Sequence, residues 1–516
     1  MKSLWDDKLL QLENKRNAAE NAGGIERIEK QHRSGKLTAR ERMNALFDDG
    51  TFTELNELVE SSATDFGMDK NRRTGDGVIT GYGKIHGKTV FAASQDFTVN
   101  GGSLGAAHAK KICRVMDKAL EMRVPFISIN DSGGARIEEG IDGLAGYADI
   151  FYRNTIASGV IPQISVIMGP CAGGACYSPA ISDFIFMTAA NGQMYITGPQ
   201  VVKSVTGEIV TSAELGGASV HSQKSGVAHF VYDDDLSCLN GVRRLLGYLP
   251  RNNAEAPPLF QGVSVDECHR LRDIVSDNPK RAYDVKQVID TFIDKNSFFE
   301  VQEEFAKNMI VGFARLEGRT IGLIANQSKH ISGSLEIDSS DKAARFIRFC
   351  DCFNIPLLSL VDVPAFMPGS KQEHEGIIRH GAKLIYAFAE ATVPKVCLIM
   401  RKAYGGAYIA MNSKGLSADI VFAWPIAEIA VMGADGAVNI IGRRWLEAAE
   451  DKDAERKRLI DEYNDKFITP YIAASHGYVD EVIRPEETRS RIVSAFEMLQ
   501  SKKKAMPFKK HGNIPL

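Results

Sequence analysis

The chain has 516 residues and a nearly balanced charge, with 62 basic and 65 acidic side chains and a formal net charge of −3. The length exceeds what one hydrophobic core usually supports, so we expect two or more domains. The charge balance indicates no nucleic-acid partner, and the longest apolar runs are too short to span a membrane. With no signal-peptide pattern at the start, the sequence predicts no membrane insertion and a cytoplasmic location.

The eight cysteines are scattered along the chain without a CxxC pair. Most stand in apolar stretches, a setting that favours buried free thiols over disulfides or metal ligands. The sequence therefore predicts no metal site.

In the first half, the charged and weakly amphipathic residues 1–35 predict a helical arm. Residues 106–123 carry apolar side chains at helical spacing, which predicts a long helix. The short apolar run FISIND at residues 126–131 is typical of a buried parallel strand. Two glycine loops follow, DSGGAR at residues 131–136 and GPCAGGA at residues 169–175.

The polar, proline-rich stretch of residues 250–258 predicts a domain boundary, with a linker that runs to about Tyr283. The second half then repeats the earlier pattern, with a predicted helix at residues 339–353 and the apolar run LLSLVD at residues 357–362. The last predicted feature is a solvated basic tail at residues 502–510. The glycine loops of this half are DVPAFMPG at residues 362–369 and KAYGGA at residues 402–407.

The two halves match at a nearly constant offset, which indicates an internal duplication. The matching positions are Gln95 with Gln327, Ser103 and Leu104 with Ser334 and Leu335, Pro125 with Pro356, Asp131 with Asp362, and Gly173 and Gly174 with Gly405 and Gly406. Alternating strands and helices predict an α/β fold with right-handed crossovers. We therefore expect the active site at the carboxyl ends of the strands, where the glycine loops lie.

The sequence contains no nucleotide-phosphate loop, HExxH zinc motif, GxSxG elbow or dinucleotide fingerprint. A strand that turns through Gly-Gly-Ala into a helix instead exposes backbone N–H groups at the positive end of that helix. Such a turn can form an oxyanion hole, although close packing of a strand on a helix also requires glycine. The equivalent turns at Gly173 and Gly405 favour the oxyanion hole.

A side-chain acid or base is harder to find in the sequence. The candidates His108, His330 and His380 are each interpreted as structural or surface histidines. Asp131 and Asp362 end apolar strands and are interpreted as braces for the loops that follow. A site with two oxyanion holes and no dedicated base suggests that one substrate supplies the base.

The chain resembles the carboxyltransferase (β) subunits of biotin-dependent acyl-CoA carboxylases, especially propionyl-CoA carboxylase, and the related methylmalonyl-CoA transcarboxylase. The resemblance covers nearly the whole chain. Its most specific stretches are EKQHRSGKLTARERMNALFD, NDSGGARIEEGID, GPCAGGACYSPA, GIIRHGAKLIYAFAEATVPK, RKAYGGAYIAM and AWPIAEIAVMGADGAVN.

This resemblance implies two tandem crotonase-like domains, over residues 1–258 on the acyl-CoA side and 270–510 on the biotin side. It also implies a homo-hexamer in which the N-terminal half of one subunit faces the C-terminal half of another. For the acyl-CoA side the implied residues are Gly173, Gly174 and Ala175 at the thioester oxygen, with Gly133, Gly134, Ala135, Tyr177 and Ile409 around the substrate. For biotin they are Gly405, Gly406, Ala407 and Phe366.

The reaction that the family implies is transfer of the carboxyl group from carboxybiotin to a short-chain acyl-CoA, with propionyl-CoA the leading substrate and acetyl-CoA and butyryl-CoA as further candidates. The chain has no biotinyl-lysine motif and no ATP-binding loop, so the biotin carboxylase and the biotin carrier are expected on other polypeptides. Two alternatives remain: the reverse reaction, in a methylmalonyl-CoA decarboxylase or transcarboxylase, and a crotonase-type hydratase or thioesterase. Ile409 resembles family members that accept several acyl groups, and Ala365 and Ser328 depart from the usual glycine and proline.

Overall fold

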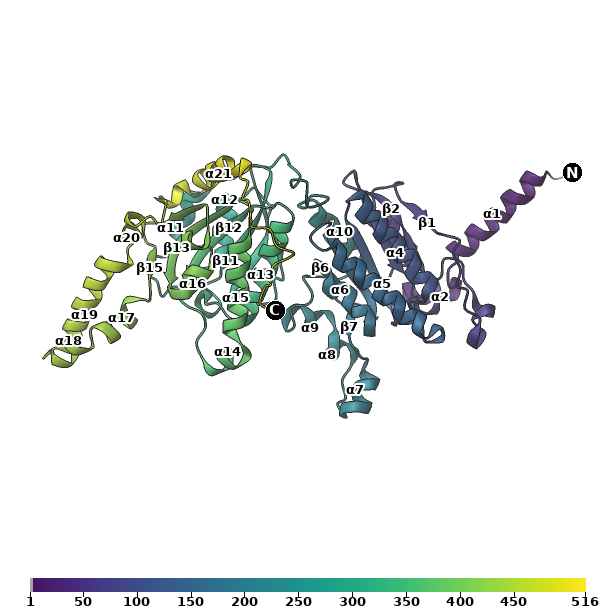
Figure 1. Cartoon of the computed structure of the whole chain (residues 1–516), viewed down its shortest axis with the longest axis horizontal. Helices are drawn as coiled ribbons and strands as arrows, with labels where there is room; N and C mark the ends of the chain where they lie inside the picture. Colours follow the sequence, from purple (N-terminus) through teal and green to yellow (C-terminus); the bar gives the residue numbers. More distant parts are fainter. Residues whose placement is uncertain (1–2) are drawn as a thin grey trace. The chain divides into compact units, whose positions relative to one another are not determined.

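The computed structural model describes residues 3–516 and divides into two compact units, Met1–Glu255 (unit 1) and Ala256–Leu516 (unit 2). Each unit contains one eight-stranded mixed sheet. Helices α4 and α5 lie side by side over the first sheet, and α13 and α15 lie in the same way over the second (Figure 1). The predicted duplicated α/β fold is confirmed.

Unit 1 orders its strands β1-β2-β3-β4-β5-β6-β8, and β7 pairs with the end of β5. The first three strands are antiparallel and those from β3 onward are parallel. The strands are β1 (Thr53–Leu55), β2 (Val78–Ile85), β3 (Lys88–Gln95), β4 (Phe126–Ser132), β5 (Gln163–Ala172), β6 (Phe184–Thr188), β7 (Gln193–Tyr195) and β8 (Phe230–Tyr232). The helices are α1 (Leu4–Glu20), α2 (Ile25–Arg33), α3 (Ala39–Leu46), α4 (Ala106–Met122), α5 (Ile141–Ala157), α6 (Tyr177–Ile181), α7 (Pro199–Thr206), α8 (Ser212–Gly216), α9 (Ala218–Gln223) and α10 (Asp235–Leu246).

Unit 2 has the same connectivity, with the sheet order β9-β10-β11-β12-β13-β14-β16 and with β15 paired to the end of β13. The strands are β9 (Phe299–Val301), β10 (Met309–Leu316), β11 (Arg319–Asn326), β12 (Leu357–Val363), β13 (Lys395–Tyr404), β14 (Ile420–Ala423), β15 (Glu428–Ala430) and β16 (Glu481–Val482). The helices are α11 (Leu271–Ile274), α12 (Val285–Phe292), α13 (Ile337–Cys352), α14 (Ser370–Glu375), α15 (Ile377–Glu390), α16 (Gly405–Ala410), α17 (Ala434–Ile441), α18 (Arg443–Ala448), α19 (Lys452–Tyr463), α20 (Pro470–Ser475) and α21 (Thr488–Met498).

The predicted long helices correspond to α4 and α13, and the predicted apolar strands to β4 and β12. Strand β12 is buried along its whole length, as expected for a parallel strand covered on both faces. Helix α4 buries Ile112, Val115 and Met116 in the core of unit 1 and ends at Arg123 in the left-handed conformation. The sequence patterns of these segments therefore predict the helices and strands correctly.

The same polar brace holds a hairpin in both units. Asp48 accepts hydrogen bonds from the backbone N–H groups of the β2–β3 turn, and Asp294 accepts from those of the β10–β11 turn. An arginine of the last helix pairs with each carboxylate, Arg243 at 2.8 Å in unit 1 and Arg489 at 3.0 Å in unit 2. The duplication thus extends to the backbone hydrogen bonds of the hairpin, whereas the two arginines come from different turns of their helices.

Three sequence predictions need correction. Residue Asn326, and not Gln327, occupies the position of Gln95, because each ends its strand and accepts a hydrogen bond from the backbone N–H of the equivalent aspartate. The predicted linker does not reach Tyr283, since Cys268 and Tyr283 are buried in the core of unit 2. The C-terminal tail is not simply solvated, because Lys502 pairs with Asp419 at 2.7 Å.

Residues 4–33 form helices α1 and α2, as the arm prediction required. Helix α1 is mostly exposed, with Ala19 as its buried residue. Among residues 3–516, no helix is long and apolar enough to cross a membrane. The eight cysteines are free, and all but Cys352 are buried.

Candidate active site

The glycine loops of unit 1 leave from neighbouring strands at the same edge of the sheet. Strands β4 and β5 are parallel neighbours whose ends meet where Ser132 pairs with Cys171. The next loop residues are also close, because a Cβ atom added to Gly134 would lie 3.1 Å from the carbonyl oxygen of Ala172. The predicted group 133–135 and the predicted group 173–175 therefore lie together.

The turn after β5 depends on the conformation of Gly173. Its φ of 66° lies in the left-handed region, which glycine adopts without the strain that a side chain brings. A 3₁₀ turn, Gly173–Cys176, follows at once and continues into α6. The first N–H groups of such a helical segment have no carbonyl partner within it. They are available to an anion that approaches the end of β5.

A second donor comes from the loop after β4. The N–H of Leu104 donates to the carbonyl of Gly134 at 2.9 Å, and the N–H of Arg136 donates to the carbonyl of Leu104 at 2.9 Å. This pairing uses the groups on both sides of Ala135, so the N–H of Ala135 itself points away from Leu104. Ala135 can therefore join the Gly174 turn in holding one oxygen.

Unit 2 repeats this arrangement. Gly405 has a φ of 57° and begins α16 directly after β13. Leu335 donates to the carbonyl of Ala365 at 3.0 Å and accepts from Met367 at 2.6 Å, so Phe366 takes the place of Ala135. The backbone of the two sites is therefore alike.

The side chains of the two sites differ at this position. The Phe366 ring would lie 2.9 Å from a Cβ atom on Gly381 and 4.0 Å from one on Gly406, so it fills the space between α15 and α16. In unit 1, where Ala135 is small, the Tyr147 ring lies 3.3 Å from the Cβ position of Gly174. The two holes are thus lined by aromatic rings from different elements.

Tyr177 and Ile409 occupy the same position in the two copies, since each lies three residues after the second glycine of its turn. Tyr177 is 47% exposed and Ile409 is 48% exposed. The Tyr177 ring packs edge-on against Phe151 at 6.1 Å. Tyr177 belongs to unit 1 and Ile409 to unit 2.

Asp131 braces the acyl-side candidate loop from a fully buried position. Its carboxylate accepts from Lys36 at 2.7 Å and from Arg42 at 2.9 Å, and Arg42 also reaches Asp235 at 2.7 Å. Burial acts to lower the pKa of Arg42, but the two carboxylates outweigh it and leave that pKa raised. The N-terminal segment is therefore tied to the strand end that carries the loop.

Asp362 has the same place in unit 2 but a different partner. Arg401 donates to it at 2.9 Å and also donates to the backbone carbonyls of Asn278 and Arg281. The guanidinium carbon of Arg401 lies 4.9 Å from the centre of the Tyr283 ring. The first segment of unit 2 is thus bound to its strand end, as the N-terminal segment is in unit 1.

The three histidine candidates do not converge on either turn. His108 is completely buried, and burial holds its pKa well below the usual value, with Arg136 and Lys111 adding to the effect. His380 lies 2.8 Å from a carboxylate oxygen of Asp341. His330 lies in the loop after β11.

Sequence reasoning missed the cluster that fixes Ala135. Arg136 is buried and pairs with Asp76 and with Glu139, both at 2.7 Å. Glu139 in turn accepts from the first N–H of α4. The position of Arg136 two residues after the glycine pair in DSGGAR was the available signal, but its partner Asp76 comes from a distant segment. Among the residues 3–516, no group of histidine, cysteine and acidic side chains is arranged to hold a metal ion.

The geometry therefore offers one candidate backbone anion site in each unit, at the turns of Gly173 and Gly405. A family model described as the carboxyl transferase domain matches residues 30–514.

Two relatives are similar to the chain over its whole length. The carboxyltransferase subunit of propionyl-CoA carboxylase from Haloferax mediterranei is 56% identical to this chain, in an alignment that covers 99% of each. The α subunit of methylmalonyl-CoA decarboxylase from Propionigenium modestum is also 56% identical and covers 100% of each chain. The chain is thus equally similar to a carboxylase subunit and a decarboxylase subunit.

A solved structure of transcarboxylase 12S has the same fold, with a TM-score of 0.97 and 51% identity over 100% of this chain and 99% of that one. That protein is described as a hexamer assembly with methylmalonyl-coenzyme A and methylmalonic acid bound.

Proposed function

The chain belongs to the carboxyl transferase domain family, and on that premise we propose that it transfers a carboxyl group between biotin on another chain and the α carbon of propionyl-CoA. The observation that carries the proposal is the pair of equivalent backbone anion sites at Gly173 and Gly405. One site would hold the thioester and the other would hold biotin. The full-length similarity to carboxylase and decarboxylase subunits supports this reaction class.

In unit 1 we assign the acyl-CoA thioester oxygen to the N–H groups around Gly174 and Ala135. When the α proton leaves the substrate, negative charge moves onto that oxygen and strengthens both hydrogen bonds. Removal of one such donor typically costs about 3 kcal/mol of transition-state stabilisation. The brace of Arg136 and Asp76 holds the Ala135 loop in place before the charge develops. Gly133 and Tyr177 would border the rest of the substrate.

In unit 2 we assign the ureido oxygen of biotin to the N–H groups of Gly406, Ala407 and Phe366. The residues fit such a ring, because a Cβ atom on Gly406 would meet only the edge of Phe366, at 4.0 Å. Bound carboxybiotin supplies the carboxyl group and, once that group has left, the base that the protein lacks. Phe366 would cover one face of the ring and exclude water.

The substrate and the direction of transfer form the finer part of the proposal. We favour propionyl-CoA and its carboxylated product because the carboxylase, decarboxylase and transcarboxylase relatives are named for propionyl-CoA or methylmalonyl-CoA. Ile409 would border the acyl group, and its apolar side chain is compatible with acetyl and butyryl groups as well. The reverse reaction, decarboxylation of methylmalonyl-CoA, uses the same site.

We further propose that the chain works with a biotin carboxylase and a biotin carrier on other polypeptides, in a homo-hexamer like that of transcarboxylase 12S. A hydratase or thioesterase reading is less well supported. It would need a carboxylate beside the Gly173 turn, whereas the atoms nearest to the Cβ positions of Gly173 and Gly174 belong to the Ile196 carbonyl and the Tyr147 ring.

The test is to incubate the purified chain with methylmalonyl-CoA and free biotin and to follow loss of the carboxyl group from the thioester. We expect turnover that depends on biotin. Crotonyl-CoA and acetyl-CoA, offered without biotin, serve as hydratase and thioesterase controls. Turnover of these controls, or an absence of biotin-dependent turnover with malonyl-CoA and methylmalonyl-CoA alike, would exclude the carboxyltransferase proposal.

A further inference from the structure

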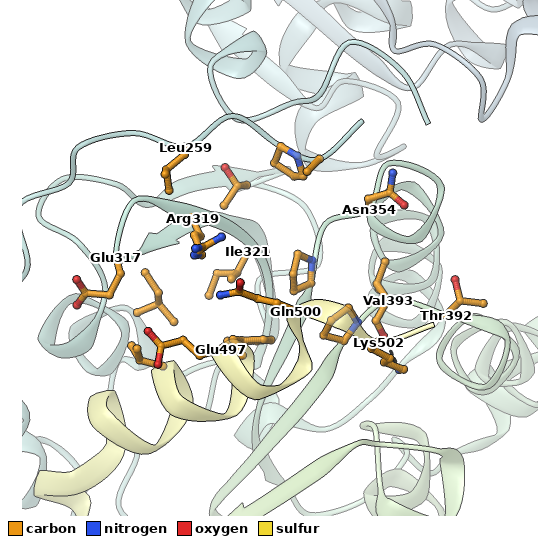
Figure 2. Close-up of a pocket in the computed structure, with 18 of the residues that line it drawn as sticks. Leu259, Glu317, Arg319, Ile321, Asn354, Thr392, Val393, Glu497, Gln500 and Lys502 are labelled. Atoms are coloured by element: carbon orange, nitrogen blue, oxygen red, sulfur yellow. Dashed lines mark hydrogen bonds between the residues drawn. The ribbon is translucent and has the colours of Figure 1, made fainter. Parts of the chain in front are cut away.

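Unit 2 contains a cavity of about 730 Å³ at the edge of the sheet where β11, β12 and β13 begin (Figure 2). This is the edge opposite to the glycine turns, which lie at the carboxyl ends of the same strands. The volume lies in the range of small-molecule sites, which is roughly 300 to 1,000 Å³. The lining residues used below are Arg319, Thr320, Ile321, Phe496, Glu497, Gln500 and Lys503.

The same place in unit 1 is closed. The equivalent strand residues Lys88, Thr89 and Val90 surround a cavity of only about 10 Å³. Leu249 closes it and is 2% exposed, with Leu246 also buried beside it. The duplicated fold does not require an open cavity at this edge.

The difference lies in the segment that follows the last helix of each unit. Unit 1 supplies Leu246 and Leu249, whereas unit 2 supplies Glu497 and Gln500, which remain exposed (Figure 2). The chain of unit 1 then seals the edge, because Asn252 donates to the carbonyl of Arg123 at 2.9 Å. Polar replacements in unit 2 therefore keep open a space that apolar side chains fill in unit 1.

The walls of the open cavity are mainly apolar, with Ile321 and Phe496 among them. Thr320 also lines it, and this side chain is buried with no hydrogen-bond partner for its hydroxyl among the described residues. An unsatisfied buried hydroxyl costs about 1–3 kcal/mol. The mainly apolar walls therefore favour a ligand with an apolar body.

The charges at the rim favour an anion. Arg319 and Lys503 have no ion-pair or hydrogen-bond partner within residues 3–516, and Lys504 contacts only a serine hydroxyl. Of the acidic residues, Glu317 is already paired with Arg489, which leaves Glu497 facing Arg319 across the cavity (Figure 2). The excess of cations attracts one carboxylate, while Glu497 would repel a polyanion such as a nucleotide.

We propose that this cavity binds an amphiphilic monocarboxylate, a small molecule with an apolar body and a single carboxylate of the fatty-acid type. Arg319 and Lys503 bind the carboxylate, and the apolar body lies between Ile321 and Phe496. The site is separate from both glycine turns and does not depend on the carboxyl transfer reaction.

The experiment titrates the assembled full-length protein with decanoate in a calorimeter. We expect one saturable site per chain. Arg319→Gln should weaken binding at least fivefold, and the double change Glu497→Leu with Gln500→Leu, which reproduces the residues of unit 1, should weaken it at least tenfold. Lys88→Gln, the equivalent of Arg319 at the closed edge, is the matched control and should leave the affinity unchanged.

Carboxyl transfer activity of each variant shows that it is folded, since none of these residues belongs to the candidate active site. The proposal is overturned if decanoate does not saturate, if decylamine binds as tightly as decanoate, or if Arg319→Gln and Lys88→Gln have equal effects. The single variant Arg319→Gln keeps the test decisive if the double variant does not fold.

Discussion

Units 1 and 2 share their scaffold and differ where ligands would bind. Equivalent carboxylates brace equivalent hairpins through Asp48 and Asp294, and equivalent strand ends through Asp131 and Asp362. The loop residue beside each glycine turn differs, with Ala135 in one unit and Phe366 in the other. Duplication has kept the backbone donors in place, and under the proposed function the different side chains beside them would select a different ligand for each glycine turn.

The two strand-end braces offer the strongest test of this comparison. Asp131 faces two buried cations, whereas the single cation at Asp362 also has carbonyl acceptors. Asp131→Asn should lower the free energy of unfolding by about 3–5 kcal/mol, because it leaves the buried Lys36 without a carboxylate partner, while Arg42 keeps Asp235. Asp362→Asn should lower the free energy of unfolding by about 1–3 kcal/mol. Chemical denaturation measures both, and equal losses would contradict the difference between the braces.

The glycine turns separate the two ligand roles. Gly406→Val should reduce biotin-dependent transfer by about 100-fold or more while acyl-CoA still binds, and Gly174→Val should weaken the acyl-CoA side. Single-turnover rates and direct acyl-CoA binding measure the two effects. Gly415→Val is the control, since a Cβ atom there meets nothing within 4 Å. If both turn variants lost both functions equally, the division of roles would be wrong.

Two buried lysines at equivalent positions allow a third test, through the pH dependence of the free energy of unfolding. Lys111 donates to the carbonyls of Gly75 and Val78, and the equivalent Lys342 donates to Gln302 and Phe305. Burial lowers the pKa of Lys111 to about 8 and that of Lys342 to about 7.

An unfolded lysine keeps its proton up to about pH 10, so between the folded and unfolded pKa values the unfolded chain binds more protons. The contribution of each lysine to stability therefore grows as the pH rises through this window, and below the folded pKa it no longer changes with pH. The free energy of unfolding, measured by denaturation from pH 6.5 to 9.5, should rise less steeply with pH in Lys342→Met than in wild type. An unchanged slope would show that Lys342 does not titrate in this range.

The smallest expected effect concerns Ser328, whose equivalent in unit 1 is Phe97. The Ser328 hydroxyl donates to the carbonyl of Tyr283 and accepts from its N–H, both at 3.0 Å. Ser328→Ala should cost about 1 kcal/mol of unfolding free energy. Phe97→Ala removes a cation–π contact with Lys36 and should cost a similar amount. A loss above about 3 kcal/mol for Ser328→Ala would mean that this contact anchors the whole preceding segment.

Sequence was sufficient for features that depend on neighbouring residues. Helical periodicity located α4, a short apolar run located β4, and repetition drew attention to the turns at Gly173 and Gly405. The family's roles for these turns remain proposals. Contacts between distant segments were beyond local patterns, as with Arg136 and Asp76. The core role of Cys268 was hidden because the polar, proline-rich stretch before it has the composition of a linker.

The brace at Asp131 has a consequence for synthesis of the protein. Arg42 reaches Asp131 and also Asp235, which follows it by 193 residues. At a synthesis rate of about 5–20 residues per second, Asp235 is made roughly 10 to 40 seconds after α3. Arg401 follows its partner Asp362 by only 39 residues, a delay of roughly 2 to 8 seconds. Nascent chains stalled before residue 235 should therefore expose α3 to protease. The pair of Arg489 and Asp294 in unit 2 spans 195 residues, so the hairpin of that unit completes its brace with a similar delay.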